Sequence, residues 1–480
     1  MTRTCMVVGI ILLFVTTSLI PSIAQDDEKS SLPTSNDNWL YVGGSGQGNY
    51  TTIQSAIDSA NPGDTVFVFN GTYPENILIS KFIRLIGQDT QSTRIKGKNS
   101  ESVMTLRCDS IFVSGFSIFN GSNGLEILSD FCEVSNNNIS QNKIHGIKLL
   151  QSNYTKINGN NIKDNVRGIS SYQSTNNSVY YNLFERNNRA LSLWYSSDNN
   201  ILSHNTFLMN HNDCISLYYS SNNLITQNTF TNNNYSIFLF QSSKNNLMNN
   251  TISFNNDVGI LLEHSFGNLL SGNTISENRN GIYLYFSYLN SIINNSIYDN
   301  KDVGIYCSTL LDNSSTIYDP MMLDIHQSTR YTIINTTENN AIIGNYLSNN
   351  NKGIVVEDTT NITIRSNSII HNNQNGVELV NAADCLLYNN SICNNQFGIK
   401  LIKSSDCLIH FHTFSENIVH AFFINSIRIN WDSNYWDNWL ITFPKPIMGF
   451  TKKNVFFPSI QFDRSPLREP ICIFPFFNHC

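Results

Sequence analysis

The sequence is poor in charge, and this scarcity excludes several classes of protein. Only 14% of the 480 residues are Asp, Glu, Lys or Arg, against roughly 25% in an ordinary soluble domain. The 36 acidic residues outnumber the 29 basic ones, which gives a formal net charge of −7. Proteins bind nucleic-acid phosphates through basic patches, so this balance argues against nucleic acid as a partner.

Long apolar runs and paired cysteine motifs are also missing. Beyond the N-terminal segment, no stretch reaches the roughly 18 apolar residues that a membrane helix needs, so we expect no membrane span in the mature chain. Cys5 lies in that segment, and the nine other cysteines are scattered without a Cys-x-x-Cys pair. An odd number leaves at least one thiol unpaired or bound to another chain, and the spacing excludes a small disulfide scaffold.

The first 24 residues have the pattern of a secretory signal peptide. Arg3 precedes an apolar run over residues 5–15, and the small residue Ala24 ends the segment. We expect cleavage after Ala24 and a secreted, extracellular or cell-surface protein, with an uncleaved N-terminal anchor as the alternative. Residues 25–38 are polar, and we predict a disordered lead-in there.

Asparagine is the residue in excess, with 73 copies, and it recurs at a fixed period. The pattern is Asn-x-(Ile/Phe/Leu)-x-x-Asn, repeated every 22 or 23 residues with one interval of 50. The first position of the pattern is occupied by Asn137, Asn160, Asn182, Asn205, Asn228, Asn250, Asn273, Asn295, Asn345, Asn367, Asn390 and His412. The second Asn is present in all twelve copies. A constant period over this length is the signature of a stacked repeat fold.

Each repeat predicts three short β-strands and no helix. An aliphatic residue lies three positions before the first Asn, another apolar residue lies two positions after it, and a Gly-Ile-x-Leu run follows, as at 146–149 and 281–284. This alternation with Asn, Gly and Ser turns indicates strands. We therefore predict an all-β fold, a right-handed single-stranded parallel β-helix with rungs of about 22 residues. Stacked Asn amides would bridge the rungs, because an amide both donates and accepts hydrogen bonds.

The pattern also divides the chain into regions. Residues 39–135 contain the N-terminal cap and first coils, with a short amphipathic helix over 50–60. Residues 136–430 hold the asparagine repeats, and the aromatic stretch 431–480 is predicted to be the C-terminal cap and tail. The interval of 50 residues equals one 22-residue coil plus 28 further residues, which we assign to an insertion at 308–340.

Several of these segments resemble known families. The stretch from Tyr50 to Tyr73, with Gly63-Asp64-Thr65-Val66, resembles the N-terminal cap and first coil of pectin-lyase-like β-helix proteins. The asparagine repeats, the Gly-Ile-x-Leu runs and the closing Asn-Tyr-Trp at 434–436 are similar to the NosD family. The resemblance extends over about residues 40–440. It implies a fold that is shared with carbohydrate-binding and sugar-hydrolase modules. The NosD family is described as periplasmic copper-binding, and by analogy the resemblance also implies an archaeal surface protein.

An aromatic row follows the Gly-Ile-x-Leu runs at an outward position. Rings repeating at the rung spacing would form a platform for sugar rings, and exposed aromatic patches usually mark a contact surface. We therefore predict a polysaccharide or cell-envelope glycan as the partner. The alternative is that the 308–340 insertion folds back over this face. The row consists of Tyr172, Trp194, Tyr218, Phe240 and Tyr285.

A carboxylate pair is the candidate catalytic site. Glu277 and Asp299 are 22 residues apart, so they should stack on adjacent rungs. Paired carboxylates can perform acid/base chemistry on a glycosidic bond, and the same cluster with calcium would suit a lyase. The alternative is a solvated turn whose mixed charges partly cancel.

A third candidate is a copper site at Cys407, His410 and His412, because copper prefers thiolate and imidazole ligands. The alternative is that these residues are small or polar substitutes inside the repeat columns. Cys385 occupies the same slot as Cys407 one coil earlier, so we expect the two to be stacked neighbours, close enough for a disulfide.

These observations favour a secreted or cell-surface β-helix protein that is non-catalytic and binds a glycan or serves as a structural element. Two alternatives remain open at this stage: a polysaccharide lyase or glycoside hydrolase using Glu277 and Asp299, and a periplasmic-type copper-binding protein. Copper or calcium would be the cofactor of those alternatives. The sequence leaves the oligomeric state open.

Overall fold

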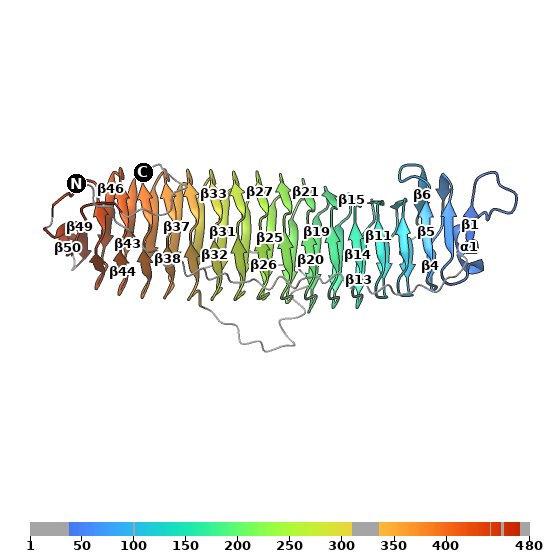
Figure 1. The fold of residues 1–480 in the computed structure, drawn as a ribbon, viewed down its shortest axis with the longest axis horizontal. Coiled ribbons are helices and arrows are strands. Elements are labelled where there is room, and N and C mark those ends of the chain that lie inside the picture. The colour runs from blue at the N-terminus through green and yellow to red at the C-terminus, as the bar shows by residue number, and fades with distance from the viewer. Residues whose placement is uncertain (1–37, 99–100, 310–335, 442, 453–455, 471–480) are drawn as a thin grey trace, which may run out of the picture.

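A computed structural model describes residues 38–98, 101–309, 336–441, 443–452 and 456–470 of the chain. The chain winds into stacked coils that form a long rod, with α1 at one end and β49 and β50 at the other (Figure 1). The prediction of an all-β parallel β-helix is confirmed. The proposed signal peptide and lead-in lie almost entirely outside the described residues, as do residues 310–335 of the proposed insertion.

Each coil contributes one strand to each of three faces, which we call the short, middle and long faces. The short face precedes the first Asn of each repeat, the middle face lies between the two Asn residues, and the long face follows the second. All neighbouring strands along a face are parallel, whereas β49 and β50 pair antiparallel.

The short-face strands are β1 (Trp39–Val42), β2 (Thr65–Val68), β5 (Arg84–Gly87), β8 (Phe112–Ser114), β11 (Glu133–Ser135), β14 (Lys156–Asn158), β17 (Ser178–Tyr180), β20 (Ile201–Ser203), β23 (Leu224–Thr226), β26 (Asn246–Met248), β29 (Leu269–Ser271), β32 (Ser291–Ile293), β35 (Ala341–Ile343), β38 (Thr363–Arg365), β41 (Leu386–Tyr388), β44 (Leu408–His410), β47 (Asn430–Asp432) and β50 (Phe456–Asp463).

The middle-face strands are β3 (Gly71–Tyr73), β6 (Thr93–Lys96), β9 (Ser117–Phe119), β12 (Asn138–Ser140), β15 (Asn161–Lys163), β18 (Leu183–Glu185), β21 (Thr206–Leu208), β24 (Thr229–Thr231), β27 (Thr251–Ser253), β30 (Thr274–Ser276), β33 (Ser296–Tyr298), β36 (Tyr346–Ser348), β39 (Ser368–Ile370), β42 (Ser391–Cys393), β45 (Thr413–Ser415) and β48 (Tyr435–Trp436).

The long-face strands are β4 (Ile77–Ile79), β7 (Met104–Leu106), β10 (Asn123–Ile127), β13 (His145–Leu150), β16 (Arg167–Tyr172), β19 (Arg189–Trp194), β22 (Asp213–Tyr218), β25 (Tyr235–Phe240), β28 (Val258–Glu263), β31 (Asn280–Tyr285), β34 (Val303–Ser308), β37 (Lys352–Glu357), β40 (Asn375–Val380), β43 (Phe397–Ile402), β46 (Val419–Ile424) and β49 (Lys445–Lys452).

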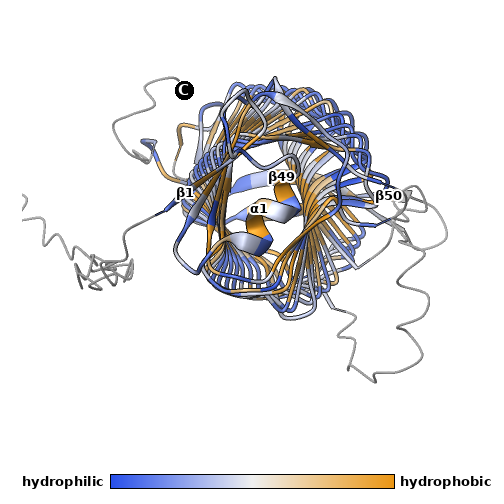
Figure 2. Cartoon of the chain, turned by 90° about the vertical axis from the view of Figure 1, so that its right-hand side faces the viewer, coloured by the Kyte–Doolittle hydropathy of each residue, from blue (hydrophilic) through white to orange (hydrophobic). Residues whose placement is uncertain are grey.

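The hydrophobic core runs along the inside of the coil. Seen down the axis, apolar segments line the interior and polar ones the exterior (Figure 2). From β9 to β45 the central residue of every middle-face strand is buried, and three successive phenylalanines, Phe184, Phe207 and Phe230, stack with ring centroids 4.8 and 4.7 Å apart. Because side chains alternate along a strand, the residues on either side of each core position point outward.

The asparagine columns form hydrogen-bonded ladders, as the sequence predicts. The side-chain oxygen of Asn228 accepts the backbone N–H and the amide N–H of Asn205, at 2.9 and 3.1 Å. Its own amide group donates to Asn250 at 3.1 Å and to the carbonyl of Leu202 at 2.8 Å. The ladder continues from Asn295 to Asn345, so the coils stay in register across the 50-residue interval. Each amide satisfies buried backbone groups where the chain turns.

A third asparagine ladder is present that the sequence analysis missed. It lies five residues before the first ladder and has the same pattern of contacts. Its members are Asn177, Asn200, Asn223, Asn245, Asn268, Asn290 and Asn340. Much of the remaining asparagine occupies turn residues with positive φ, such as Asn232 and Asn249, a conformation that Asn tolerates better than most residues.

The two ends of the rod are closed differently. Helix α1 (Ile53–Ser59) buries Ile53 and Ile57 at the first coil, and Glu75 accepts the backbone N–H of Ile53 at 2.9 Å. At the other end, the carboxylate of Asp463 accepts the backbone and amide N–H groups of Asn434, both at 3.0 Å. A carboxylate only accepts hydrogen bonds, so Asp463 terminates the first ladder without leaving a donor that needs a further rung.

Candidate functional site

The predicted aromatic row is in register on the long face. Tyr172 pairs with Trp194, Trp194 with Tyr218, and Tyr218 with Phe240 on successive strands. Their rings are close to parallel at the start of the row, with centroids 6.1 Å apart between Tyr172 and Trp194 and 4.0 Å apart between Trp194 and Tyr218. The stacked arrangement expected of the row is therefore present on the outside of the coil.

The expected accessibility of that row is not observed. Trp194, Tyr218 and Tyr285 are only 2%, 0% and 1% exposed, and Phe240 is also buried. They belong to a second hydrophobic cluster on the outer side of the long face, separate from the main core. Further along the face, the outward residues Phe238 and Leu261 are apolar and belong to the same cluster, so they help to bury the rings. The alternative that the 308–340 insertion folds back over this face falls on residues 310–335, which lie outside the described residues.

The accessible rim of this face combines the predicted Tyr172 with two residues that sequence reasoning missed. Tyr195 and Tyr219 directly follow the row, have positive φ, and stack with centroids 5.8 Å apart and an angle of 13°. Both are half-buried, as is Tyr172. The signal was available, because the residue after each row position recurs with the same period. We call Tyr172, Tyr195 and Tyr219 the aromatic rim.

Polar groups accompany the rings. Ser170, Ser192 and Ser216 lie two residues before the row on successive strands and are fully buried, and the hydroxyls of Ser192 and Ser216 are 2.9 Å apart. Among the described residues, the hydroxyl of Ser170 and the indole N–H of Trp194 have no hydrogen-bond partner. This face therefore combines flat apolar rings with unsatisfied polar groups beneath them.

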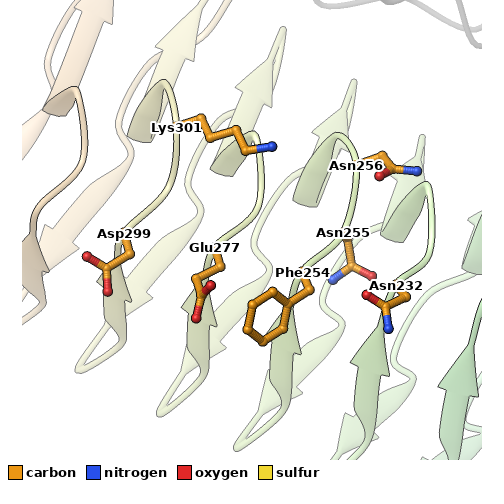
Figure 3. Close-up of a pocket in the computed structure, with 7 residues that line it drawn as sticks. All are labelled: Asn232, Phe254, Asn255, Asn256, Glu277, Asp299 and Lys301. Atoms are coloured by element: carbon orange, nitrogen blue, oxygen red, sulfur yellow. The ribbon is translucent and has the colours of Figure 1, made fainter.

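The predicted carboxylate pair lies in a hollow of about 550 Å³ on another side of the rod. Glu277 and Asp299 occupy equivalent turn positions of adjacent rungs, both with φ of 55°, and both are exposed. Figure 3 shows them projecting from neighbouring turns, with Lys301 on the same turn as Asp299. The stacking expected of the pair is thus observed. The hollow is also lined by Asn232, Phe254, Asn255 and Asn256.

The two carboxylates in this hollow, Glu277 and Asp299, have similar environments. Glycoside chemistry separates an acid from a base by giving two carboxyl groups different environments. Here both carboxylates are solvent-exposed at equivalent positions, so nothing in the geometry assigns them different roles. The neighbouring Arg279 pairs with Asp302 at 3.2 Å, an exposed ion pair of little energetic weight.

The predicted copper ligands do not converge. Cys407 is buried inside the coil, whereas His410 lies on the outward side of β44, next to the core residue Ile409. His412 occupies the first ladder, where its Nδ1 accepts the backbone N–H of Asn390 at 3.1 Å. Within the described ranges, no group of three His, Cys, Asp or Glu residues is arranged to hold a metal ion. Strand alternation sends these three side chains apart, so they do not form a copper site.

The environment of His412 is that of a ladder member. Burial lowers the pKa of His412 from its ordinary 6.5 to about 3. Its Nδ1 accepts a hydrogen bond, so the neutral imidazole carries its proton on Nε2, and that buried atom has no partner among the described residues. The side chain therefore replaces an amide as acceptor but leaves one donor unsatisfied.

Among the described cysteines, some are free thiols and one is disulfide-bonded. Cys385 and Cys407 are stacked neighbours, as expected, since Leu386 pairs with Leu408 on adjacent rungs, but both are free thiols. Each thiol donates to a backbone carbonyl, at 3.4 Å for Cys385 and 3.2 Å for Cys407. Cys393, by contrast, is disulfide-bonded, and it lies on the outward side of β42 beside the core residue Ile392.

Two family models match the chain. The model described as "Periplasmic copper-binding protein (NosD)" matches residues 57–216 and 210–331. The model described as "Right handed beta helix region" matches residues 309–440. Together they cover most of the coil and agree with the handedness that the repeat pattern predicts.

One curated relative is a cell surface glycoprotein of Methanothermus fervidus. It is 34% identical to the chain over 101 residues, which are 20% of this chain and 17% of that protein. The chain thus matches under a fifth of the length of that relative.

Similar solved structures have low sequence identity. A mannuronic acid specific polysaccharide family 6 lyase from human gut microbiota is 13% identical, covers 73% of this chain and 86% of its own, and has a TM-score of 0.46. The DFA-IIIase from Arthrobacter chlorophenolicus is 13% identical, with coverages of 64% and 94% and a TM-score of 0.44. The A-module of a mannuronan C-5 epimerase from Azotobacter vinelandii is 13% identical, with coverages of 78% and 90% and a TM-score of 0.34.

Proposed function

The chain belongs to the NosD family of right-handed β-helix proteins, and from this premise we propose that it is a non-catalytic cell-surface rod that binds a polysaccharide or cell-envelope glycan along its long face. The observation that carries the proposal is the stack of aromatic rings at rung spacing, with its half-buried rim. Aromatic rings offer broad apolar faces with few internal degrees of freedom. A sugar ring presents a matching apolar face and hydroxyls at its edge.

The polar groups of this face support the same ligand class. The hydroxyl of Ser170 and the indole N–H of Trp194 are buried without a partner among the described residues, and buried polar groups are costly when unpaired. Neither atom is accessible to a ligand in this conformation, whereas Tyr172 is half-buried and lies at the rim. Arg167 also donates to the Tyr172 hydroxyl at 3.4 Å, which orients one ring of the rim.

A surface location is supported by two independent observations. The disulfide at Cys393 is a feature of oxidising compartments outside the cytosol. The matching relative is itself named a cell surface glycoprotein. The apolar N-terminal segment with small residues before Gln25 adds the pattern of a secretory signal.

The test is a glycan-array or polysaccharide pull-down with the variant Tyr195→Ala/Tyr219→Ala. We expect a loss of affinity of about tenfold or more, since each stacked ring contributes on the order of 1 kcal/mol. Tyr181→Ala is the matched control, because Tyr181 is 63% exposed on a turn preceding the middle face. Unchanged binding in the double variant, or equal loss in the control, would remove the assignment. Trp194→Ala is less suitable, because that ring is buried and its loss will also destabilise the coil.

A second candidate function is a polysaccharide lyase or glycoside hydrolase. It is favoured by Glu277 and Asp299 lining one hollow with Lys301. The variant Glu277→Gln/Asp299→Asn tests it through release of reducing ends or unsaturated products from a panel of polysaccharides. Activity in the wild type that disappears in the variant would support catalysis, whereas wild-type activity in the variant would dispose of this pair as the catalytic residues.

A further inference from the structure

The hairpin at the C-terminal end of the rod carries an apolar face. β49 and β50 pair antiparallel, with Pro446 opposite Phe462 and Met448 opposite Ile460. Residues directly opposite each other in an antiparallel pair point to the same face. Met448, Ile460 and Phe462 are 53%, 50% and 49% exposed, so this face carries large apolar side chains in contact with solvent.

The opposite face of the same hairpin covers the coil. Ile447 is 2% exposed and belongs to the main core, and Asp463 is fully buried where it terminates the first ladder. The apolar face therefore points away from the coil, at the end of the rod remote from α1 (Figure 1). Three further exposed apolar residues immediately precede the hairpin: Leu440, Ile441 and Phe443.

The segment that contains the hairpin also has a net charge opposite in sign to that of the whole chain. Residues 439–470 contain five basic and two acidic residues, a net charge of +3, whereas the whole chain has −7. Of the two acids, Asp463 is buried in the ladder terminus. The exposed basic residues Arg464 and Arg468 follow β50 directly. Apolar side chains and basic charge are thus concentrated together at one end.

We propose that this C-terminal end docks on a membrane surface that contains anionic lipids. Exposed apolar side chains enter the interface between headgroups and acyl chains, while nearby Lys and Arg residues are attracted to anionic headgroups. A second copy of the chain docking through the same face would bring two positively charged ends together, so charge complementarity favours the lipid surface. The rod would then stand with its α1 end away from the membrane and its long face open to the surroundings.

Vesicle flotation with the full chain tests this proposal. We expect the protein to float with phosphatidylcholine vesicles that contain about 30% phosphatidylglycerol and to remain in the soluble fraction with phosphatidylcholine alone. The variant Met448→Ser/Ile460→Ser/Phe462→Ser should lose about tenfold or more in partitioning, because it removes apolar area from the docking face. The matched control is Phe131→Ser/Tyr154→Ser/Tyr181→Ser, which alters three residues that are 55%, 51% and 63% exposed and lie far from the hairpin.

A charge variant separates the electrostatic contribution. The variant Arg464→Ser/Arg468→Ser should float less with the anionic vesicles and should still not float with the neutral ones. Added salt should weaken the flotation of the wild type with anionic vesicles in the same way. The proposal is overturned if the wild type does not float, if the triple hairpin variant floats as well as the wild type, or if neutral vesicles bind equally. A dimer in light scattering that the hairpin variant abolishes, without lipid binding, would identify a second copy as the occupant and also overturn it.

Discussion

Two sets of repeating columns define this molecule, and they differ in how their side chains are satisfied. The asparagine ladders at the turns are closed systems, in which each amide bonds to the next rung and to a backbone carbonyl. The aromatic row on the long face packs ring against ring instead, and most of its rings are buried in a cluster of their own. A regular period indicates stacked side chains in both sets of columns. In the ladders, the amide groups hold neighbouring rungs together and so serve the fold. We therefore place function on the aromatic side.

The strongest test of this contrast is a break in the centre of a ladder. Asn228→Ala removes the acceptor for both N–H groups of Asn205 and the donor to Leu202. Each buried group left unsatisfied costs about 1–3 kcal/mol, so we expect the free energy of unfolding to fall by about 4 kcal/mol. Urea denaturation followed by circular dichroism measures it. The control Asn232→Gly, at an exposed positive-φ turn, should change stability little; equal losses in both would show that the ladder amides are not special.

A slightly smaller effect is expected on the aromatic side. Trp194→Ala removes a ring that is 2% exposed and stacked on Tyr218 at 4.0 Å, and losing a buried Trp costs about 3 kcal/mol. Tyr154→Ala is the control, because Tyr154 is 51% exposed although it stacks on Phe131 at 5.0 Å. We expect the control to lose less than about 1 kcal/mol. If Trp194→Ala costs no more than the control, the row is an open platform, and the contrast with the core disappears.

The pH dependence of stability tests the role of His412 as a member of the first ladder. Its folded pKa of about 3 lies below the ordinary value of 6.5, so the unfolded state binds the proton more readily. The full contribution to stability is present above pH 6.5 and is lost as the pH falls toward 3, by about 2 kcal/mol at pH 5. His412→Asn should flatten this slope and keep the ladder intact. Stability measured between pH 7 and 5 tests it, with the exposed His204→Asn as the control; an unchanged slope in His412→Asn would contradict the assignment.

The sequence predicted the coil well because its period is a property of backbone stacking. Asn228 and its equivalents mark the turns unambiguously, and the register of Tyr172, Trp194 and Tyr218 followed directly. The burial of those rings was not predictable from the period, since exposure depends on neighbours at other positions, such as Phe238 and Leu261. The three predicted copper ligands do not meet for a related reason: Cys407, His410 and His412 are close in sequence, but strand alternation and the ladder send their side chains in different directions.

The smallest predicted effect concerns the end of the third ladder, where its column continues as apolar core residues. Asn340 accepts from Asn290 at 2.9 Å, and the next position is the buried Ile362, followed by Cys385 and Cys407. The position thus changes from amide to apolar within one coil. Ile362→Asn would extend the ladder by one amide, exchanging buried apolar area for hydrogen bonds. These contributions oppose each other, so we expect a change in the free energy of unfolding of less than about 1 kcal/mol. A loss above about 3 kcal/mol would show that an amide is stabilising only where both neighbouring rungs supply partners.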